Sequence, residues 1–181
     1  MATIYYLAYG SNIHPLRLVQ RCPSAKALGL VELPDRIVRF AKASKDGSGK
    51  CTLLEMEGHM AYGVLYSIEA KDKGALDAAE GLGHGYTEQL FQVPLNGVGY
   101  HAFSYLSAIS HFNPTLQPYD WYKALVVCGA RFMGMNAVYV TELDAIVAIR
   151  DPSSSRRASE YARLQALGCT LYLGGHDGKA I

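Results

Sequence analysis

The order of two kinds of pattern along the chain most constrains its fold. Up to about residue 107 the sequence consists mainly of short apolar and aromatic runs bounded by turn-forming residues, which is typical of β-strands. After Asn113-Pro114 the apolar residues recur with helical spacing. Strands in front and helices behind predict an α+β domain, or a small closed β-barrel with helices packed on it.

We expect one domain over residues 1–181, because nothing repeats and no linker divides the chain. The predicted strands cover residues 3–9, 26–33, 36–43, 51–56, 60–67, 86–93 and 98–107, and Pro34-Asp35 separates the second strand from the third. The predicted helices cover residues 14–21, 69–80, 118–132, 136–149 and 153–167, with a last short strand over Thr170–Leu173.

The composition argues against several classes of partner. The 17 basic and 16 acidic residues nearly balance, and no Lys/Arg cluster indicates nucleic acid. The apolar runs are shorter than the roughly 20 residues of a membrane helix, and the N-terminus lacks the pattern of a signal peptide. Four widely spread cysteines without a C-x-x-C pair predict reduced thiols in a cytoplasmic protein, with Cys128 as a small core residue. The sequence leaves open whether the protein is a monomer or a homodimer.

The stretch from Ile4 to Asn12 carries the strongest local signal. It reads as a buried strand that ends abruptly in Gly10-Ser11-Asn12. Gly10 permits close approach of a ligand, and Ser11 or Asn12 is expected to cap the helix that follows. Unpaired N–H groups at the start of that helix then form an anion or oxyanion pocket. From the local pattern alone, a plain β-turn explains the stretch equally well.

Glu80 is the leading candidate for acid–base chemistry, at the end of a predicted helix and before a glycine-rich loop. The helix face that buries Leu76 is expected to carry Ala79 and Glu80 inward. A carboxylate placed among apolar side chains is suited to proton transfer near neutrality. The competing interpretation is a solvated glutamate at a helix end, which is the commoner case.

Other candidate motifs lack the residue spacing or context that their chemistry requires. Ser11 lacks the G-x-S-x-G nucleophile pattern, which leaves a hydrolase using Ser11 as a weaker alternative. The six histidines show no H-x-x-x-H or H-E-x-x-H spacing, so no metal site is expected. Gly81, Gly83 and Gly85 follow a helix rather than a strand, which argues against phosphate binding. Thirteen tyrosines are unusual in a chain of this size, and we expect several to line a polar pocket.

Four blocks together resemble the γ-glutamylcyclotransferase-like family. The run from Tyr6 to Asn12, Tyr-Leu-Ala-Tyr-Gly-Ser-Asn, is similar to the family's opening signature. The other three blocks follow in the family's order: Leu76–Gly81 with Tyr86, Phe103–Leu106, and Tyr122–Ala130 with Tyr139-Val140. The resemblance covers roughly residues 3 to 147, and the stretch from about 150 onward has no counterpart. The loop after Glu80, Thr87-Glu88 and the segment before Tyr122 depart from the family's usual pattern, which bears on substrate choice.

The resemblance implies a small mixed β-barrel with flanking helices. It also implies an enzyme that cleaves a γ-glutamyl amino acid or amine to 5-oxoproline and a free amine, without a cofactor. Glu80 would be the catalytic acid/base, and the substrate contacts would come from Tyr6, Leu7, Ala8, Tyr9, Gly10, Ser11, Asn12, Tyr105 and Tyr122. The alternative on the same fold is a non-catalytic module that binds a γ-glutamyl ligand.

Overall fold

The computed structural model describes residues 2–169 and confirms the expected α+β class. Five strands form one mixed sheet in the order β2-β3-β1-β5-β4. Neighbouring strands are antiparallel except for β1 and β5, which are parallel. The strands are β1 (Thr3–Ala8), β2 (Lys26–Ala43), β3 (Gly49–Glu69), β4 (Tyr86–Leu95) and β5 (Val98–Ser107).

The expectation of a closed barrel is wrong. Strands β2 and β4 are the two edges of the sheet, and within residues 2–169 no ladder of hydrogen bonds joins them. The edges nevertheless approach each other, because a Cβ atom on Gly29 of β2 would lie 3.0 Å from the side chain of Leu95 on β4. The sheet is therefore curled but open, and side-chain packing rather than strand pairing fills the seam.

Two strand breaks expected from the sequence are absent. Pro34 pairs with Met60 inside the continuous strands β2 and β3, and the register shifts between Pro34 and Arg36. Asp35 takes a left-handed conformation with φ of 53°, and its Oδ1 accepts a hydrogen bond from Gly58 N at 2.8 Å. Turn-forming residues therefore make a β-bulge here, and the edge position of β2 tolerates the missing N–H of proline.

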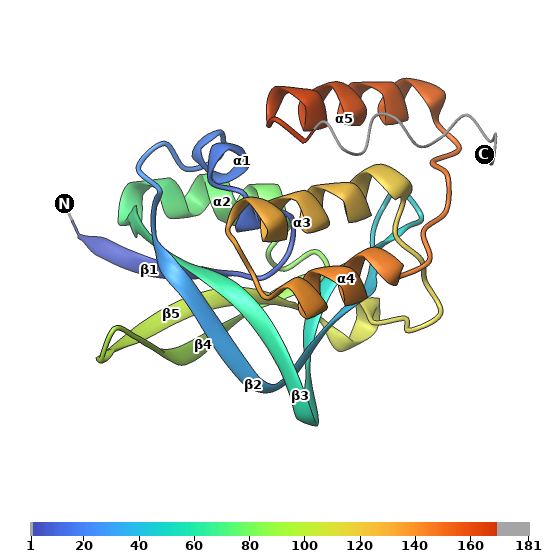
Figure 1. Ribbon diagram of the computed structural model, residues 1–181. Coiled ribbons are helices and arrows are strands. Elements are labelled where there is room, and N and C mark those ends of the chain that lie inside the picture. The colour runs from blue at the N-terminus through green and yellow to red at the C-terminus, as the bar shows by residue number, and fades with distance from the viewer. Residues whose placement is uncertain (1, 170–181) are drawn as a thin grey trace.

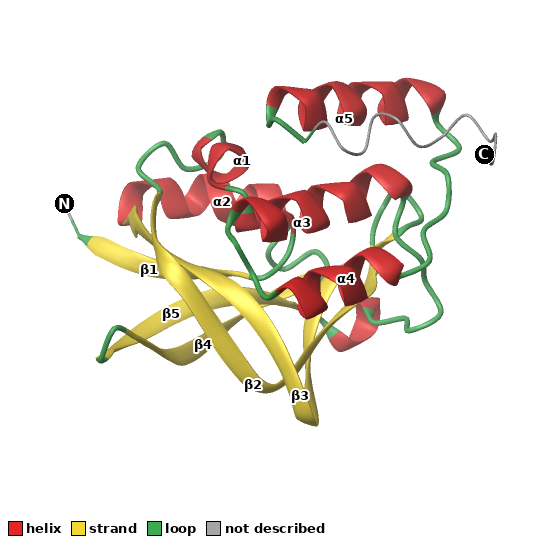
Figure 2. Cartoon of the chain, in the orientation of Figure 1, coloured by secondary structure: helices red, strands yellow, loops and turns green. Residues whose placement is uncertain are grey.

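The helices lie together on one side of the sheet, and α5 lies farthest from it (Figures 1 and 2). They are α1 (Pro15–Val19), α2 (Lys73–Glu80), α3 (Asp120–Phe132), α4 (Ala137–Ala145) and α5 (Ser154–Ala166), with short 3-10 turns η1 (Ser11–Ile13), η2 (Ala70–Asp72) and η3 (Ile109–His111). Each expected helix is present, although α4 ends before the expected residue 149. The expected strand at Thr170–Leu173 lies outside the described residues. Between residues 2 and 169 no helix is long and apolar enough to cross a membrane.

Helix α3 is the central helix of the packed layer. Its Gly129 lies so close to the turn η1 that a Cβ atom there would be 3.0 Å from His14 N. On its other side, Asp120 pairs with Arg157 of α5, with 2.7 Å between Oδ2 and Nε. Because α3 contacts both η1 and α5, it links the first strand's end to the last described helix.

The expectation of reduced thiols is wrong for two of the four cysteines. Cys128 on α3 and Cys169 after α5 form a disulfide, and their Cα atoms are 5.8 Å apart. The pair is 41 residues apart in sequence, and only the docking of α5 on α3 brings the two sulfurs together. Cys22 and Cys51 are free and buried.

Candidate active site

The turn after β1 is held by hydrogen bonds from three sides. Ile13 N donates to the Gly10 carbonyl at 3.0 Å, which closes η1. Tyr66 of β3 donates its hydroxyl proton to the Ile13 carbonyl at 2.6 Å, and Ser104 of β5 donates to the Leu7 carbonyl at 2.6 Å. These bonds fix the turn against two strands of the sheet.

Gly10 is needed for close approach at this turn. A Cβ atom on Gly10 would lie 3.1 Å from the Cβ of Cys51 on β3 and 3.8 Å from the Tyr122 hydroxyl. The expected cap is wrong, because α1 starts at Pro15 and its N-cap, His14, makes no side-chain capping bond. Asn12 instead turns its side chain toward Glu80.

Glu80 is the last residue of α2, and its side chain is turned inward. Gly81 ends the helix in the left-handed conformation with φ of 72°, the usual helix C-terminus for glycine. The Glu80 side chain is only 17% exposed, which favours the inward position over a solvated one. Leu76 is fully buried as expected, but Ala79 is exposed, so the expectation for Ala79 is wrong.

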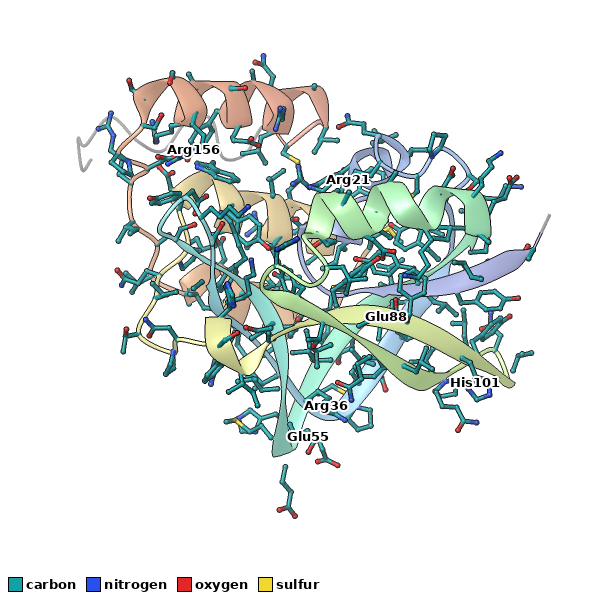
Figure 3. All side chains as sticks on the ribbon, turned by 180° about the vertical axis from the view of Figure 1, so that it is seen from behind. Arg21, Arg36, Glu55, Glu88, His101 and Arg156 are labelled. Atoms are coloured by element: carbon teal, nitrogen blue, oxygen red, sulfur yellow. A yellow bond between two sulfur atoms is a disulfide. The ribbon has the colours of Figure 1, made fainter. Side chains whose placement is uncertain are left out.

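The surroundings of the Glu80 carboxylate are polar rather than apolar. Its Oε1 accepts a hydrogen bond from Asn12 Nδ2 at 2.8 Å and one from Arg21 Nη1 at 2.5 Å. Arg21 follows α1, lies beside α2 in Figure 3, and also donates to Asn12 Oδ1 at 3.0 Å. The three side chains form a closed triangle of hydrogen bonds, which holds the carboxylate in one orientation.

The cavity in front of Glu80 encloses about 290 Å³, including its open mouth. The expectation of a tyrosine-lined pocket is confirmed. The lining residues are Tyr6, Tyr9, Gly10, Ser11, Asn12, Cys51, Glu80, Tyr86, Tyr105 and Tyr122.

Two of the expected substrate contacts do not reach this cavity. Leu7 and Ala8 are fully buried in the core and are absent from the lining. Three residues near Glu80 were missed by the sequence analysis: Cys51 and Tyr86 in the lining, and Arg21 behind the carboxylate. Tyr86 follows the Glu80 block in the family-like pattern, which is a usable signal. Cys51 and Arg21 have none, because tertiary packing alone brings them to Glu80.

Each tyrosine of the lining is anchored through its hydroxyl group. Tyr86 donates to the Cys51 carbonyl at 2.7 Å, Tyr9 donates to the Tyr105 carbonyl, and Tyr105 donates to Asp77 Oδ1 at 2.6 Å. The other two hydroxyl oxygens accept: Tyr6 from Asn12 at 3.1 Å, and Tyr122 from Cys51 N at 3.3 Å. Because they accept, Tyr6 and Tyr122 each retain a proton for donation.

Burial keeps these hydroxyl groups protonated. It raises the pKa of Tyr6, and the nearby charge of Glu80 raises it further. Burial also raises the pKa of Tyr122 well above its ordinary value. At neutral pH both groups are therefore neutral hydrogen-bond donors, which suits an oxygen atom of an anionic ligand.

Comparison with curated proteins finds relatives named gamma-glutamylcyclotransferase. No family model matches the sequence. Human gamma-glutamylcyclotransferase is 27% identical over 148 residues, which cover 78% of this chain and 77% of the human protein. The mouse protein of the same name is 28% identical over 151 residues, covering 80% of this chain and 79% of its own.

Solved structures share the fold. A structure named "Gamma-glutamyl cyclotransferase" superposes with a TM-score of 0.77 at 24% identity, covering 89% of this chain and 99% of its own. YkqA from Bacillus subtilis superposes with a TM-score of 0.69 at 21% identity, covering 82% of this chain and 57% of its own. The curated relatives and the shared fold together support the assignment of this chain to the gamma-glutamylcyclotransferase-like family.

Proposed function

We propose that this protein cleaves a γ-glutamyl amino acid or amine to 5-oxoproline and a free amine, with Glu80 as general acid/base. The observation that carries the proposal is the position of Glu80, an inward carboxylate at the wall of a tyrosine-lined cavity, hydrogen-bonded to Asn12 of the β1 turn. The curated relatives carry the name of this activity.

The reaction is an intramolecular displacement at the γ-carbonyl. Glu80 takes a proton from the substrate's α-ammonium, and the freed amine attacks the γ-carbonyl carbon. The new C–N bond closes a five-membered ring and leaves an oxyanion on the tetrahedral carbon. Glu80 then returns the proton to the departing nitrogen, and the old C–N bond breaks. The released amine takes up the second proton of the ring nitrogen, which leaves a neutral lactam and an ammonium. One carboxyl group serves both steps because the two nitrogens share that carbon.

The hydrogen bonds of Glu80 suit this proton shuttle. Asn12 and Arg21 both donate to Oε1, which leaves Oε2 as the oxygen that exchanges the proton. Arg21 therefore acts as a positioning residue in this mechanism, because it orients Glu80 and Asn12 without lining the cavity.

The anionic parts of the substrate need hydrogen-bond donors in the lining of the cavity. The backbone N–H groups of Ser11 and Asn12 lie in the first turn of η1, where a helix offers them no carbonyl. They suit either the oxyanion or the substrate's α-carboxylate. Tyr6 and Tyr122 supply hydroxyl protons to the same cavity. A cavity that holds the substrate curled also removes entropy before the chemical step.

The test is an assay for 5-oxoproline by mass spectrometry with γ-glutamyl dipeptides, γ-glutamyl-ε-lysine and glutathione as donors. We expect product from the wild type and a loss of at least about 100-fold in Glu80→Gln, since general acid–base catalysis contributes roughly 10²–10⁴-fold. Glu57→Gln is the matched control, because Glu57 is exposed on β3 and outside the lining.

The same assay separates the alternatives. Glu80→Gln turnover at the wild-type rate would reject Glu80 as the acid/base. Saturable binding of a γ-glutamyl ligand without product from any donor would favour the non-catalytic module. A covalent adduct on Ser11, together with loss of activity in Ser11→Ala, would favour a hydrolase.

A further inference from the structure

A second cluster of candidate ligand side chains lies outside the tyrosine-lined cavity, where His14 follows η1. His14 is 1% exposed, and among the described residues neither of its ring nitrogens has a hydrogen-bond partner. Its ring packs on the ring of Phe132, with 4.3 Å between the centroids. This contact fixes the ring but gives neither nitrogen a hydrogen bond. Buried polar groups without partners are rare and costly, so this imidazole needs an explanation.

The unpartnered imidazole lies beside the disulfide. One ligand atom each from His14, Cys128 and Cys169 lies within 4.8 Å of the other two, and all three residues are buried. They come from three separate elements: His14 follows η1, Cys128 is on α3, and Cys169 follows α5. Gly129 allows this close approach, because a Cβ atom there would lie only 3.0 Å from His14 N.

We propose that, once the Cys128–Cys169 disulfide is reduced, these two sulfurs and the His14 imidazole bind a thiophilic divalent cation such as Zn²⁺. Thiolate sulfur and neutral imidazole nitrogen are the ligands that zinc prefers in proteins. The three protein ligands leave a fourth position for water. This site lies outside the candidate active site, so the proposal is independent of the cyclotransferase activity.

The chemistry balances with a dithiol as reductant. The dithiol supplies two electrons and two protons, breaks the S–S bond to give two thiols, and itself becomes a disulfide. Zinc then displaces the two thiol protons as it binds both sulfurs.

The ligands remain close after reduction, because other contacts hold α5 on α3. The ion pair between Arg157 and Asp120 is 2.7 Å long, and Leu164 of α5 is fully buried. Cys169 N donates to the Leu164 carbonyl at 2.9 Å, which fixes the backbone of Cys169 at the end of α5. Reduction therefore frees the sulfur of Cys169 without releasing its backbone.

The dimensions of the cluster fit a zinc site. Zinc–sulfur bonds of about 2.3 Å at tetrahedral angles place two sulfurs about 3.8 Å apart. The two sulfurs have to separate from their covalent contact to reach this spacing, and side-chain rotation at Cys128 and Cys169 supplies the movement. The final spread is similar to the 4.8 Å within which the three ligand atoms already lie.

The experiment is a zinc titration of the full chain, in competition with a chromophoric chelator. The protein is reduced with dithiothreitol, freed of it without air, and compared with the oxidised protein. We expect about one zinc per reduced chain and none per oxidised chain. Cobalt in place of zinc should give the thiolate charge-transfer absorption of a sulfur-ligated site.

Variants locate the binding. Cys169→Ser and His14→Gln should each weaken zinc binding by at least about tenfold, since even indirect partners of a metal contribute 10–100-fold. Cys22→Ser is the control, because Cys22 is a buried free thiol outside the cluster. Circular dichroism checks folding, and Cys169→Ser carries the test if His14→Gln does not fold. No zinc on the reduced wild type, or unchanged binding in Cys169→Ser, would overturn the proposal.

Discussion

The hydroxyl of Tyr66 ties the active-site turn to the sheet, and Tyr66→Phe removes only that oxygen. Tyr66 is 1% exposed and donates to the Ile13 carbonyl at 2.6 Å. Ile13 is fully buried, so water cannot replace the lost donor. A buried acceptor left without its partner costs roughly 1–3 kcal/mol. We therefore expect the free energy of unfolding to fall by about 2 kcal/mol.

Urea denaturation followed by circular dichroism measures this loss. Tyr5→Phe is the matched control, because the Tyr5 ring packs against Tyr100 at 4.9 Å and, within residues 2–169, its hydroxyl makes no hydrogen bond. The control should change the free energy of unfolding by less than about 0.5 kcal/mol. If the free energy of unfolding of Tyr66→Phe lay within about 0.5 kcal/mol of the wild-type value, the reasoning would be refuted. The Ile13 carbonyl would then need no hydrogen-bond donor.

The same variant tests how the turn supports the proposed reaction. Ile13 follows Asn12, and Asn12 holds the Glu80 carboxylate at 2.8 Å. Loosening the turn should therefore lower 5-oxoproline formation at temperatures where Tyr66→Phe is still folded. Tyr5→Phe should keep wild-type turnover under the same conditions.

Three further predictions concern stability. Leu76→Ala leaves a cavity under α2 and should lower the free energy of unfolding by roughly 2–5 kcal/mol in urea; a loss below about 1 kcal/mol would mean that α2 does not depend on this contact. Burial opposes ionisation of Asp151, but its hydrogen bonds with Arg156 prevail and lower its pKa to about 2. Its stabilisation is present above the unfolded pKa of roughly 3.9 and is lost as pH falls through about 2, so Asp151→Asn should flatten the acid end of a stability–pH profile. The disulfide joins Cys128 and Cys169, which are 41 residues apart, and it restricts the unfolded chain. Its reduction should therefore lower the free energy of unfolding by up to about 4 kcal/mol. An unchanged urea midpoint after reduction would contradict this entropy argument.

The sequence by itself determined the local elements and the identity of the main candidate residues. The apolar run of β1, the Gly10 turn and the helix that ends at Glu80 are encoded over a few neighbouring residues, so their patterns can be recognised. The family-like blocks then indicated Tyr105 and Tyr122 before any geometry was known. Of the expected site residues, all except Leu7 and Ala8 line the cavity.

Only the tertiary structure decided which distant residues meet. Arg21 reaches Glu80 across 59 residues, and Cys128 pairs with Cys169 across 41. The open edge of the sheet and the bulge at Asp35 likewise depend on what lies beside β2. A local sequence pattern indicates the backbone preference of one helix or strand and which of its faces is buried. The spacing between elements comes from side-chain packing summed over the whole core, which no local stretch of sequence contains.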